Sequence, residues 1–210
     1  MSPDRELKHS MSAVVTPTET HAEGEQHKGR SFGWYGMVFF LASEAVFFAN
    51  LIASYLYLRI RLTGMGHEWI PAGAELEKTL PIINTIILLS SSFPMHYAAR
   101  AIAKGNKRGL TAGLILTVIL GSIFLSGQAW EYTHANFTPS TGVFGSTFFT
   151  LTGFHGAHVT AGVIFLLICF FRSLRSDFTA DRHFGVSAAE MYWHFVDVVW
   201  VLLFFVLYVI

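Results

Sequence analysis

Charged side chains and cysteine are both scarce in this sequence, and each shortage narrows what the chain can be. Only 13% of the 210 residues are Asp, Glu, Lys or Arg, whereas 52% are hydrophobic and 15% aromatic. An ordinary soluble domain carries roughly a quarter charged residues. A surface so poor in charge is not suited to water, and we expect lipid to surround most of the chain.

Positive and negative charges are also balanced, which argues against a nucleic-acid-binding protein. The 14 basic and 14 acidic side chains give a net charge of zero, whereas a nucleic-acid-binding domain is usually strongly basic. The single cysteine, Cys169, excludes an internal disulfide and any CxxC metal or redox motif. The sequence also has no Gly-rich phosphate loop, nucleophile elbow or HExxH motif, so nothing in it supports nucleotide-driven or hydrolytic chemistry.

Five apolar stretches dominate the part of the chain that follows Gly33. A helix needs about 20 residues, at 1.5 Å each, to cross a hydrocarbon core of about 30 Å, and each stretch has that length. The sequence therefore predicts an all-α, polytopic membrane protein. We expect residues 1–33 to form a polar, disordered, uncleaved tail and residues 34–210 to form a bundle of five transmembrane helices, at about 34–58, 80–99, 110–130, 145–171 and 191–210.

Lysine and arginine are unevenly distributed between the two sides of this predicted bundle. Three segments on one side, the tail and the loops at 100–109 and 172–189, contain 11 of them, whereas the other side has only Arg59, Arg61 and Lys78. Basic residues are enriched in cytoplasmic loops. We therefore expect the N-terminus in the cytoplasm and the C-terminus outside.

One carboxyl group lies deep within the first predicted helix. Glu44 is its eleventh residue, about 15 Å from the start and thus near the bilayer midplane. A charge there costs about 2.5–3.5 kcal/mol even on the more lenient insertion scale, so the group should face protein, be paired or be protonated. The sequence leaves two interpretations open, a proton-handling group and a neutral carboxyl that hydrogen-bonds a neighbouring helix.

Further polar residues lie at helical spacing in the last two apolar stretches. His155 and His158 are three residues apart, which predicts that they share one face, and Glu190, His194 and Asp197 form a polar stripe at the predicted inner end of the fifth helix. Metal ligation needs further ligands that converge on the same volume, so we favour polar contacts within the bundle for all five and predict no metal site. A di-iron centre would need two Glu-x-x-His motifs, and we find one, Glu131 to His134.

Four segments together resemble subunit III of cytochrome c oxidase, a family of the haem–copper oxidase superfamily, in a five-helix bacterial form. The resemblance runs from about Phe32 to the C-terminus, and its last two segments are long enough to be specific. The segments, in chain order, are Ser43–Phe48, Leu80–Thr85, Gly145–Phe149 with Gly153–Val159, and His183–Gly185 with Tyr192–Trp200.

The resemblance implies a non-catalytic subunit of a respiratory oxidase in the bacterial inner membrane. In this family the haem and copper belong to partner subunits, where cytochrome c delivers electrons, oxygen is reduced to water and protons are pumped. Subunit III contacts subunit I directly, within a complex that also holds subunit II and a small subunit IV. It binds phospholipid, supports proton uptake and protects the active site during turnover.

The resemblance assigns a role to Glu44 and to Arg172, and a difference in helix number affects the role of Arg172. Glu44 matches the family's buried glutamate, which reacts with hydrophobic carbodiimides, and Arg172 matches an arginine that contacts phospholipid headgroups. Seven-helix members have two additional N-terminal helices that complete a lipid-filled cleft. This chain has no apolar run before Trp34, so it cannot build that cleft alone.

Three alternatives remain at this stage. The chain could belong to a related quinol oxidase, although Gln128–Tyr132 and the Glu44 segment are more similar to the cytochrome c branch. It could be a purely structural scaffold for assembly or lipid anchoring. It could also be an independent transporter with Glu44 and His155 at the midplane, but the sequence lacks the repeat symmetry that transporter folds usually show.

Overall fold

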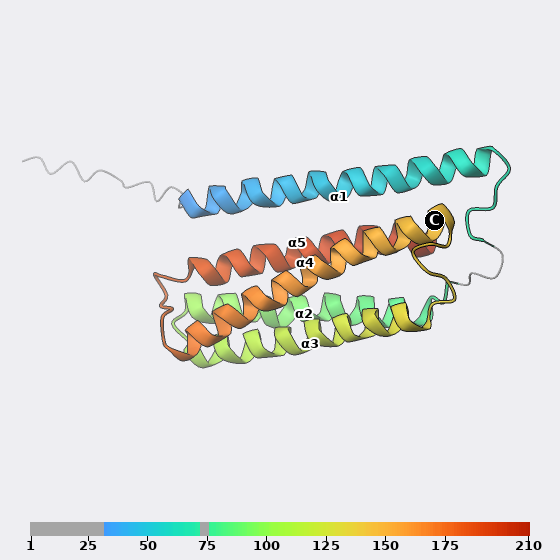
Figure 1. The fold of residues 1–210 in the computed structure, drawn as a ribbon. Helices are drawn as coiled ribbons and strands as arrows, with labels where there is room; N and C mark the ends of the chain where they lie inside the picture. The colour runs from blue at the N-terminus through green and yellow to red at the C-terminus, as the bar shows by residue number, and fades with distance from the viewer. Residues whose placement is uncertain (1–31, 72–75) are drawn as a thin grey trace, which may run out of the picture. The chain divides into compact units, whose positions relative to one another are not determined.

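Helices form all of the regular secondary structure in the residues that the computed structural model describes, 32–71 and 76–210 (Figure 1). This confirms the predicted all-α class. Of the predicted tail, residues 1–33, residues 1–31 lie outside the described residues, whereas Phe32 and Gly33 are the first residues of a helix. The elements are α1 (Phe32–Gly64), α2 (Thr79–Ala103), α3 (Lys107–His134), α4 (Gly142–Leu174), α5 (Phe184–Phe204) and the π-helical turn η1 (Phe205–Val209), which continues α5.

A tight connection joins α2 to α3 and makes them an antiparallel hairpin. Gly105 has a φ of +75°, a conformation that only glycine adopts without strain, and it reverses the chain directly after α2. Asn106 then caps α3, because its side chain accepts a hydrogen bond of 3.0 Å from the Gly109 amide. The two helices consequently pack against each other along most of their length.

Small residues let α2 and α3 approach closely. A Cβ atom placed on Gly113 of α3 would lie only 2.6 Å from the Pro94 carbonyl oxygen and 2.7 Å from the Ala98 Cβ of α2. Such contacts are typical of helix pairs in membranes, where close van der Waals packing replaces the hydrophobic effect. The remaining helices follow in order: α4 packs on α3, α5 on α4 and α2, and α1 on α4 and α5 (Figure 1).

Two buried tryptophans fasten α5 to α2. Trp193 and Trp200 are fully buried, and each indole N–H donates to a hydroxyl group of α2, Trp193 to Ser91 at 2.8 Å and Trp200 to Thr85 at 2.9 Å. A buried indole usually finds such a partner. These bonds fix the face of α5 that is turned toward α2.

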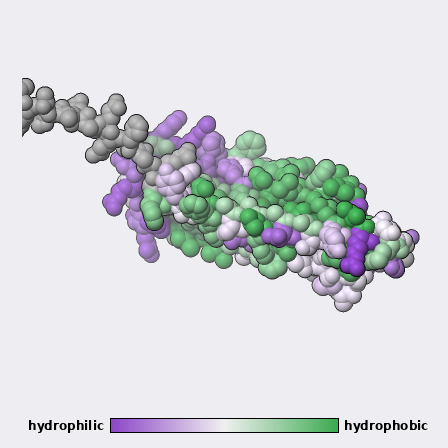
Figure 2. Space-filling model, turned by 90° about the horizontal axis from the view of Figure 1, so that it is seen from above, coloured by the Kyte–Doolittle hydropathy of each residue, from purple (hydrophilic) through white to green (hydrophobic). Residues whose placement is uncertain are grey.

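Four of the helical segments in the described residues are long and apolar enough to cross a membrane: α1, α3, α4 and α5 together with η1. On the face that Figure 2 shows, hydrophobic side chains cover most of the middle and hydrophilic ones gather at the ends, so this is a multi-pass membrane protein. Four of the five predicted spans are thus helices that could cross a membrane. At 25 residues α2 is long enough, but Asn84, the serines at 90–92 and His96 lower its hydropathy.

The helices also extend beyond the apolar segments that predicted them. The largest difference is at α5, which was predicted to begin at about residue 191 but begins at Phe184. The segment after Phe184 contains glycine, serine and alanine and is not strongly hydrophobic, yet Val186, Ala188 and Ala189 are buried against the bundle. Glu190 therefore lies in the second turn of α5 and not at its start.

Candidate functional site

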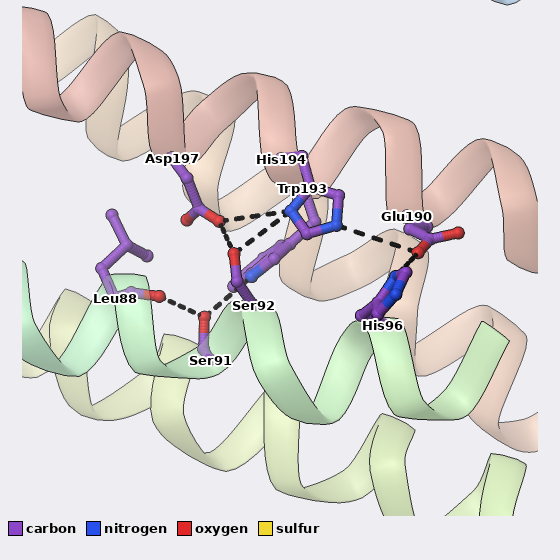
Figure 3. A network of polar contacts seen from close by, with 8 residues as sticks. All are labelled: Leu88, Ser91, Ser92, His96, Glu190, Trp193, His194 and Asp197. Atoms are coloured by element: carbon purple, nitrogen blue, oxygen red, sulfur yellow. Dashed lines mark hydrogen bonds and ion pairs between the residues drawn. The ribbon is translucent and has the colours of Figure 1, made fainter. Parts of the chain in front are cut away.

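A network of polar side chains joins α2 to α5 (Figure 3). Glu190 accepts from His96, with 2.8 Å between its Oε1 and His96 Nδ1, and the same oxygen lies 3.8 Å from His194 Nε2. On the other side of the ring, His194 Nδ1 lies 3.1 Å from the Ser92 hydroxyl and 3.8 Å from Asp197 Oδ2. Ser92 also donates to Asp197, so the five side chains form one continuous chain of contacts.

Helical spacing explains why these residues meet. Glu190, His194 and Asp197 are four and three residues apart on α5, and Ser92 and His96 are four apart on α2, so each set shares one face of its helix. The Trp193–Ser91 bond lies beside the network, and the Ser91 hydroxyl in turn donates to the Leu88 carbonyl at 2.6 Å (Figure 3). The predicted polar stripe of α5 is therefore a contact within the bundle, and its partners come from α2.

The network runs from the surface of the chain into its interior. The His96 side chain is 49% exposed, that of Glu190 is 21% exposed, and that of Asp197 is 6% exposed. One oxygen of Asp197, Oδ1, is buried with no hydrogen-bond partner among the described residues. A carboxylate so placed is usually paired or protonated.

A second polar pair connects α1 to α4. Glu44 Oε2 lies 3.0 Å from His158 Nε2, and the Glu44 side chain is only 24% exposed. The other ring nitrogen, Nδ1, lies 2.7 Å from the Phe154 carbonyl oxygen and so carries a hydrogen. The contact between Nε2 and the carboxyl group joins the two helices. Both interpretations of Glu44 therefore remain open, and each now includes His158.

His155 has different surroundings from His158, which corrects the expectation that the two imidazoles share a face. Its ring is 1% exposed and stacks on Trp200 at 4.9 Å between centroids, with the edge of Phe124 at 5.9 Å. Neither ring nitrogen has a hydrogen-bond partner in the described part of the chain, so the predicted polar contact is wrong for His155. A separation of three residues leaves about 60° around a helix, enough to turn His155 toward the core and His158 toward α1.

Arg172 lies near the end of α4, beside a hollow of about 420 Å³. Its Nε is 3.4 Å from Asp177 Oδ2, and its guanidinium lies 5.0 Å from the centre of the Phe178 ring. The side chain remains half exposed, and Arg182 lines the same hollow. The arrangement leaves guanidinium donors available to an anionic group from outside the chain.

Glu131 takes part in a third polar contact, at the opposite end of the bundle. The Tyr208 hydroxyl donates to Glu131 at 2.6 Å, which connects η1 to α3. Within α3, the Gln128 amide also donates to Glu131, at 3.1 Å. His134, the other member of the Glu-x-x-His motif, stacks on Trp130 at 4.1 Å and contacts the Trp130 carbonyl. The two residues of that motif thus have separate partners.

Comparison with known proteins identifies the family. The chain matches the family model described as Cytochrome c oxidase subunit III over residues 14–210. It is 43% identical to cytochrome c oxidase subunit 3 of Thermostichus vulcanus over 185 residues, covering 88% of this chain and 90% of the relative. The corresponding protein of Synechocystis sp. is 41% identical over 206 residues, which are 97% of this chain and 85% of the relative.

The chain belongs to the cytochrome c oxidase subunit III family. This confirms the resemblance seen in the sequence motifs, and it makes the protein a member of a respiratory oxidase complex. Relatives from mammals are similar over a shorter part of their length. The protein of Hippopotamus amphibius is 44% identical over 177 residues, which are 83% of this chain and 68% of the relative.

The sequence analysis did not identify Ser92 and His96 as members of the α2–α5 network. Three consecutive serines and a histidine in an otherwise apolar segment were the available signal. No spacing rule relates a residue of α2 to one of α5, about 100 positions later, so the sequence alone does not predict this contact. The contact of Glu131 with Tyr208 was missed for the same reason.

Proposed function

We propose that this chain is the accessory subunit of a bacterial cytochrome c oxidase, that it holds no haem or copper, and that it supports subunit I in proton uptake and in resistance to turnover damage. The observation that carries the proposal is the family match, which extends over residues 14–210. In this account haem and copper belong to subunits I and II, and cytochrome c gives its electrons to the complex and not to this chain.

The distribution of basic side chains supports a defined orientation in the cell membrane. The connections α2–α3 and α4–α5, with the adjoining helix ends, carry seven lysines and arginines in the described residues, and the other end has Arg59, Arg61 and Lys78. The excess of positive charge favours the cytoplasm for the first end. The seven are Arg100, Lys104, Lys107, Arg108, Arg172, Arg175 and Arg182.

The amphipathic character of α2 supports its role as the fifth span. Its polar residues Asn84 and Ser91 are buried, and Ser92 contacts α5, whereas Ile86 and Phe93 on the same helix are largely exposed. A helix that turns polar groups toward its neighbours and apolar groups outward is compatible with lipid. Its lower hydropathy then reflects contacts inside the bundle.

Two features support participation in proton supply. The α2–α5 network leads from exposed His96, at the end that we assign to the cytoplasm, to buried Asp197, and its members are acids, imidazoles and a hydroxyl that can pass protons. Glu44 and His158 lie 3.0 Å apart within the membrane-spanning region, close enough to exchange a proton. Ionisable residues are costly inside a membrane, so a functional role is the default hypothesis for residues at such positions.

Arg172 and Arg182 support phospholipid binding at the same end. They line one hollow, and guanidinium groups bind phosphate through paired hydrogen bonds. Asp177 lies on one side of Arg172 and leaves its outer donors free for a headgroup.

Purification through this chain tests the proposed assembly. The complex isolated in mild detergent should show haem and copper and should consume oxygen with reduced cytochrome c. Haem and copper should stay with the remaining subunits when this chain is stripped off. If the isolated chain retained stoichiometric haem, the assignment of roles would be wrong, and faster oxygen uptake with a quinol than with cytochrome c would place the complex in the quinol branch.

A further inference from the structure

Three ligand atoms of the kind that bind transition metals converge at the exposed end of the α2–α5 network. His96, Glu190 and His194 each direct one such atom into the same volume, and these atoms all lie within 4.8 Å of one another. They come from two helices that the Trp193–Ser91 bond (Figure 3) and the Trp200–Thr85 bond hold in fixed register. The cluster is therefore a product of the fold and not of a local sequence motif.

Two of the three separations between these atoms are close to what a bound ion requires, and the third is no more than 4.8 Å. Ligands at about 2.0–2.1 Å from a tetrahedral Zn²⁺ are about 3.3 Å apart. Glu190 Oε1 lies 2.8 Å from His96 Nδ1 and 3.8 Å from His194 Nε2, so one distance must lengthen and the other shorten by about 0.5 Å. The His96 and Glu190 side chains are partly exposed, and side-chain rotation alone can supply these shifts.

A second observation indicates a metal ligand independently of that cluster. An imidazole that binds a metal through one nitrogen almost always gives its other N–H to a carboxylate, carbonyl or water, which fixes the ring and raises its basicity. His194 has a related arrangement, because its Nδ1 lies 3.1 Å from the Ser92 hydroxyl, which in turn donates to Asp197. Its Nε2 is left directed at Glu190 and His96.

We propose that His96, Glu190 and His194 form a site for a divalent transition-metal ion, with Zn²⁺ as the best fit. Two imidazoles and one carboxylate are the ligand set of open zinc sites, which keep a fourth position for water or another ligand. This departs from our expectation of no metal, which considered histidines within one helix and did not include His96 of α2.

Zinc binding by the purified complex tests this site, and no turnover is needed. The complex is stripped with EDTA, incubated with ZnCl2, passed through a desalting column and assayed for zinc per haem. The wild type should hold one more tightly bound zinc than either His96→Ala or Glu190→Gln. X-ray absorption at the zinc edge should show two imidazoles and oxygen ligands at about 2.0–2.1 Å, and Asp197→Asn should weaken binding about 10–100-fold.

A matched variant controls for zinc bound elsewhere. His134→Ala removes another exposed histidine of the same chain, at the opposite end of the bundle, and should leave the zinc content unchanged. Equal zinc content in the wild type, His96→Ala and Glu190→Gln would overturn the proposal. So would an absorption spectrum that does not change on loss of His96. Neither result would affect the proposed role in the oxidase, because zinc is counted independently of oxygen consumption. In the zinc-bound form His96, Glu190 and His194 would be ligands and would not pass protons, so the proton-supply role of the α2–α5 network belongs to the metal-free form.

Discussion

The close contact between α2 and α3 predicts a large effect from a single added methyl group. In Gly113→Ala the new Cβ would lie 2.6 Å from the Pro94 carbonyl oxygen and 2.7 Å from the Ala98 Cβ. These two atoms belong to the backbone or are bonded directly to it, so neither can move aside as the end of a flexible side chain could. The two helices would have to separate by roughly 0.8 Å to restore ordinary contact.

The expected free-energy change is the balance of two terms. Overpacking of a tight contact costs about 1–3 kcal/mol, whereas replacing glycine with alanine inside a helix gains about 1 kcal/mol. Gly153→Ala in α4 is the matched control, since nothing lies within 4 Å of its added Cβ and only the gain applies. We therefore expect Gly113→Ala to be less stable than Gly153→Ala by about 1–3 kcal/mol, because the propensity gain is common to both.

Unfolding of the purified chain in mild detergent, followed by circular dichroism while temperature or SDS is raised, measures this difference. The account predicts that Gly153→Ala unfolds at or above the wild-type midpoint and Gly113→Ala below it. Equal midpoints for the two variants would refute the packing argument. A lower midpoint for Gly153→Ala than for Gly113→Ala would refute it as well.

Three further substitutions test the polar contacts. Glu44→Gln keeps the shape of the side chain but cannot exchange a proton with His158, so proton uptake by the complex should slow or its working life should shorten at equal yield. The same loss in Glu68→Gln, at an exposed loop position, would show a non-specific effect. No loss in Glu44→Gln would favour a purely structural pair. Arg172→Ala should lower the phospholipid retained per complex, counted by native mass spectrometry, without loss of haem, and Arg108→Ala should not; unchanged lipid would reject the headgroup role. Ser91→Ala leaves the buried Trp193 N–H without its acceptor and should cost about 1–3 kcal/mol in the same unfolding assay, whereas Ser126→Ala, at an exposed position of α3, should cost much less.

Much of the fold followed from composition, because lipid selects for long apolar runs and few charges. The helix ends were less predictable. The start of α5 lies seven residues before the apolar run, since Val186, Ala188 and Ala189 are held by tertiary packing and not by hydropathy. The buried polar residues of α2 lower its hydropathy, although the bundle partly encloses this helix.

The candidate site could be predicted only where its residues share a helix. The spacing of Glu190, His194 and Asp197 placed them on one face, and the structure brings all three to α2. His96 and Ser92 lie about 100 residues away in the sequence, and their position depends on how α2 packs against α5. Spacing also misled for His155 and His158, because about 60° around α4 separates a core position from one that faces α1.

The most direct test of the account is the number of turnovers that the oxidase completes with and without this chain. Oxygen consumption with reduced cytochrome c is followed to exhaustion for the intact complex, for the complex stripped of the chain and for the stripped complex with the chain added back. The account predicts an unchanged haem spectrum and initial rate, early loss of activity in the stripped complex and recovery of the full lifetime on addition of the chain. An equal lifetime in all three preparations would contradict it.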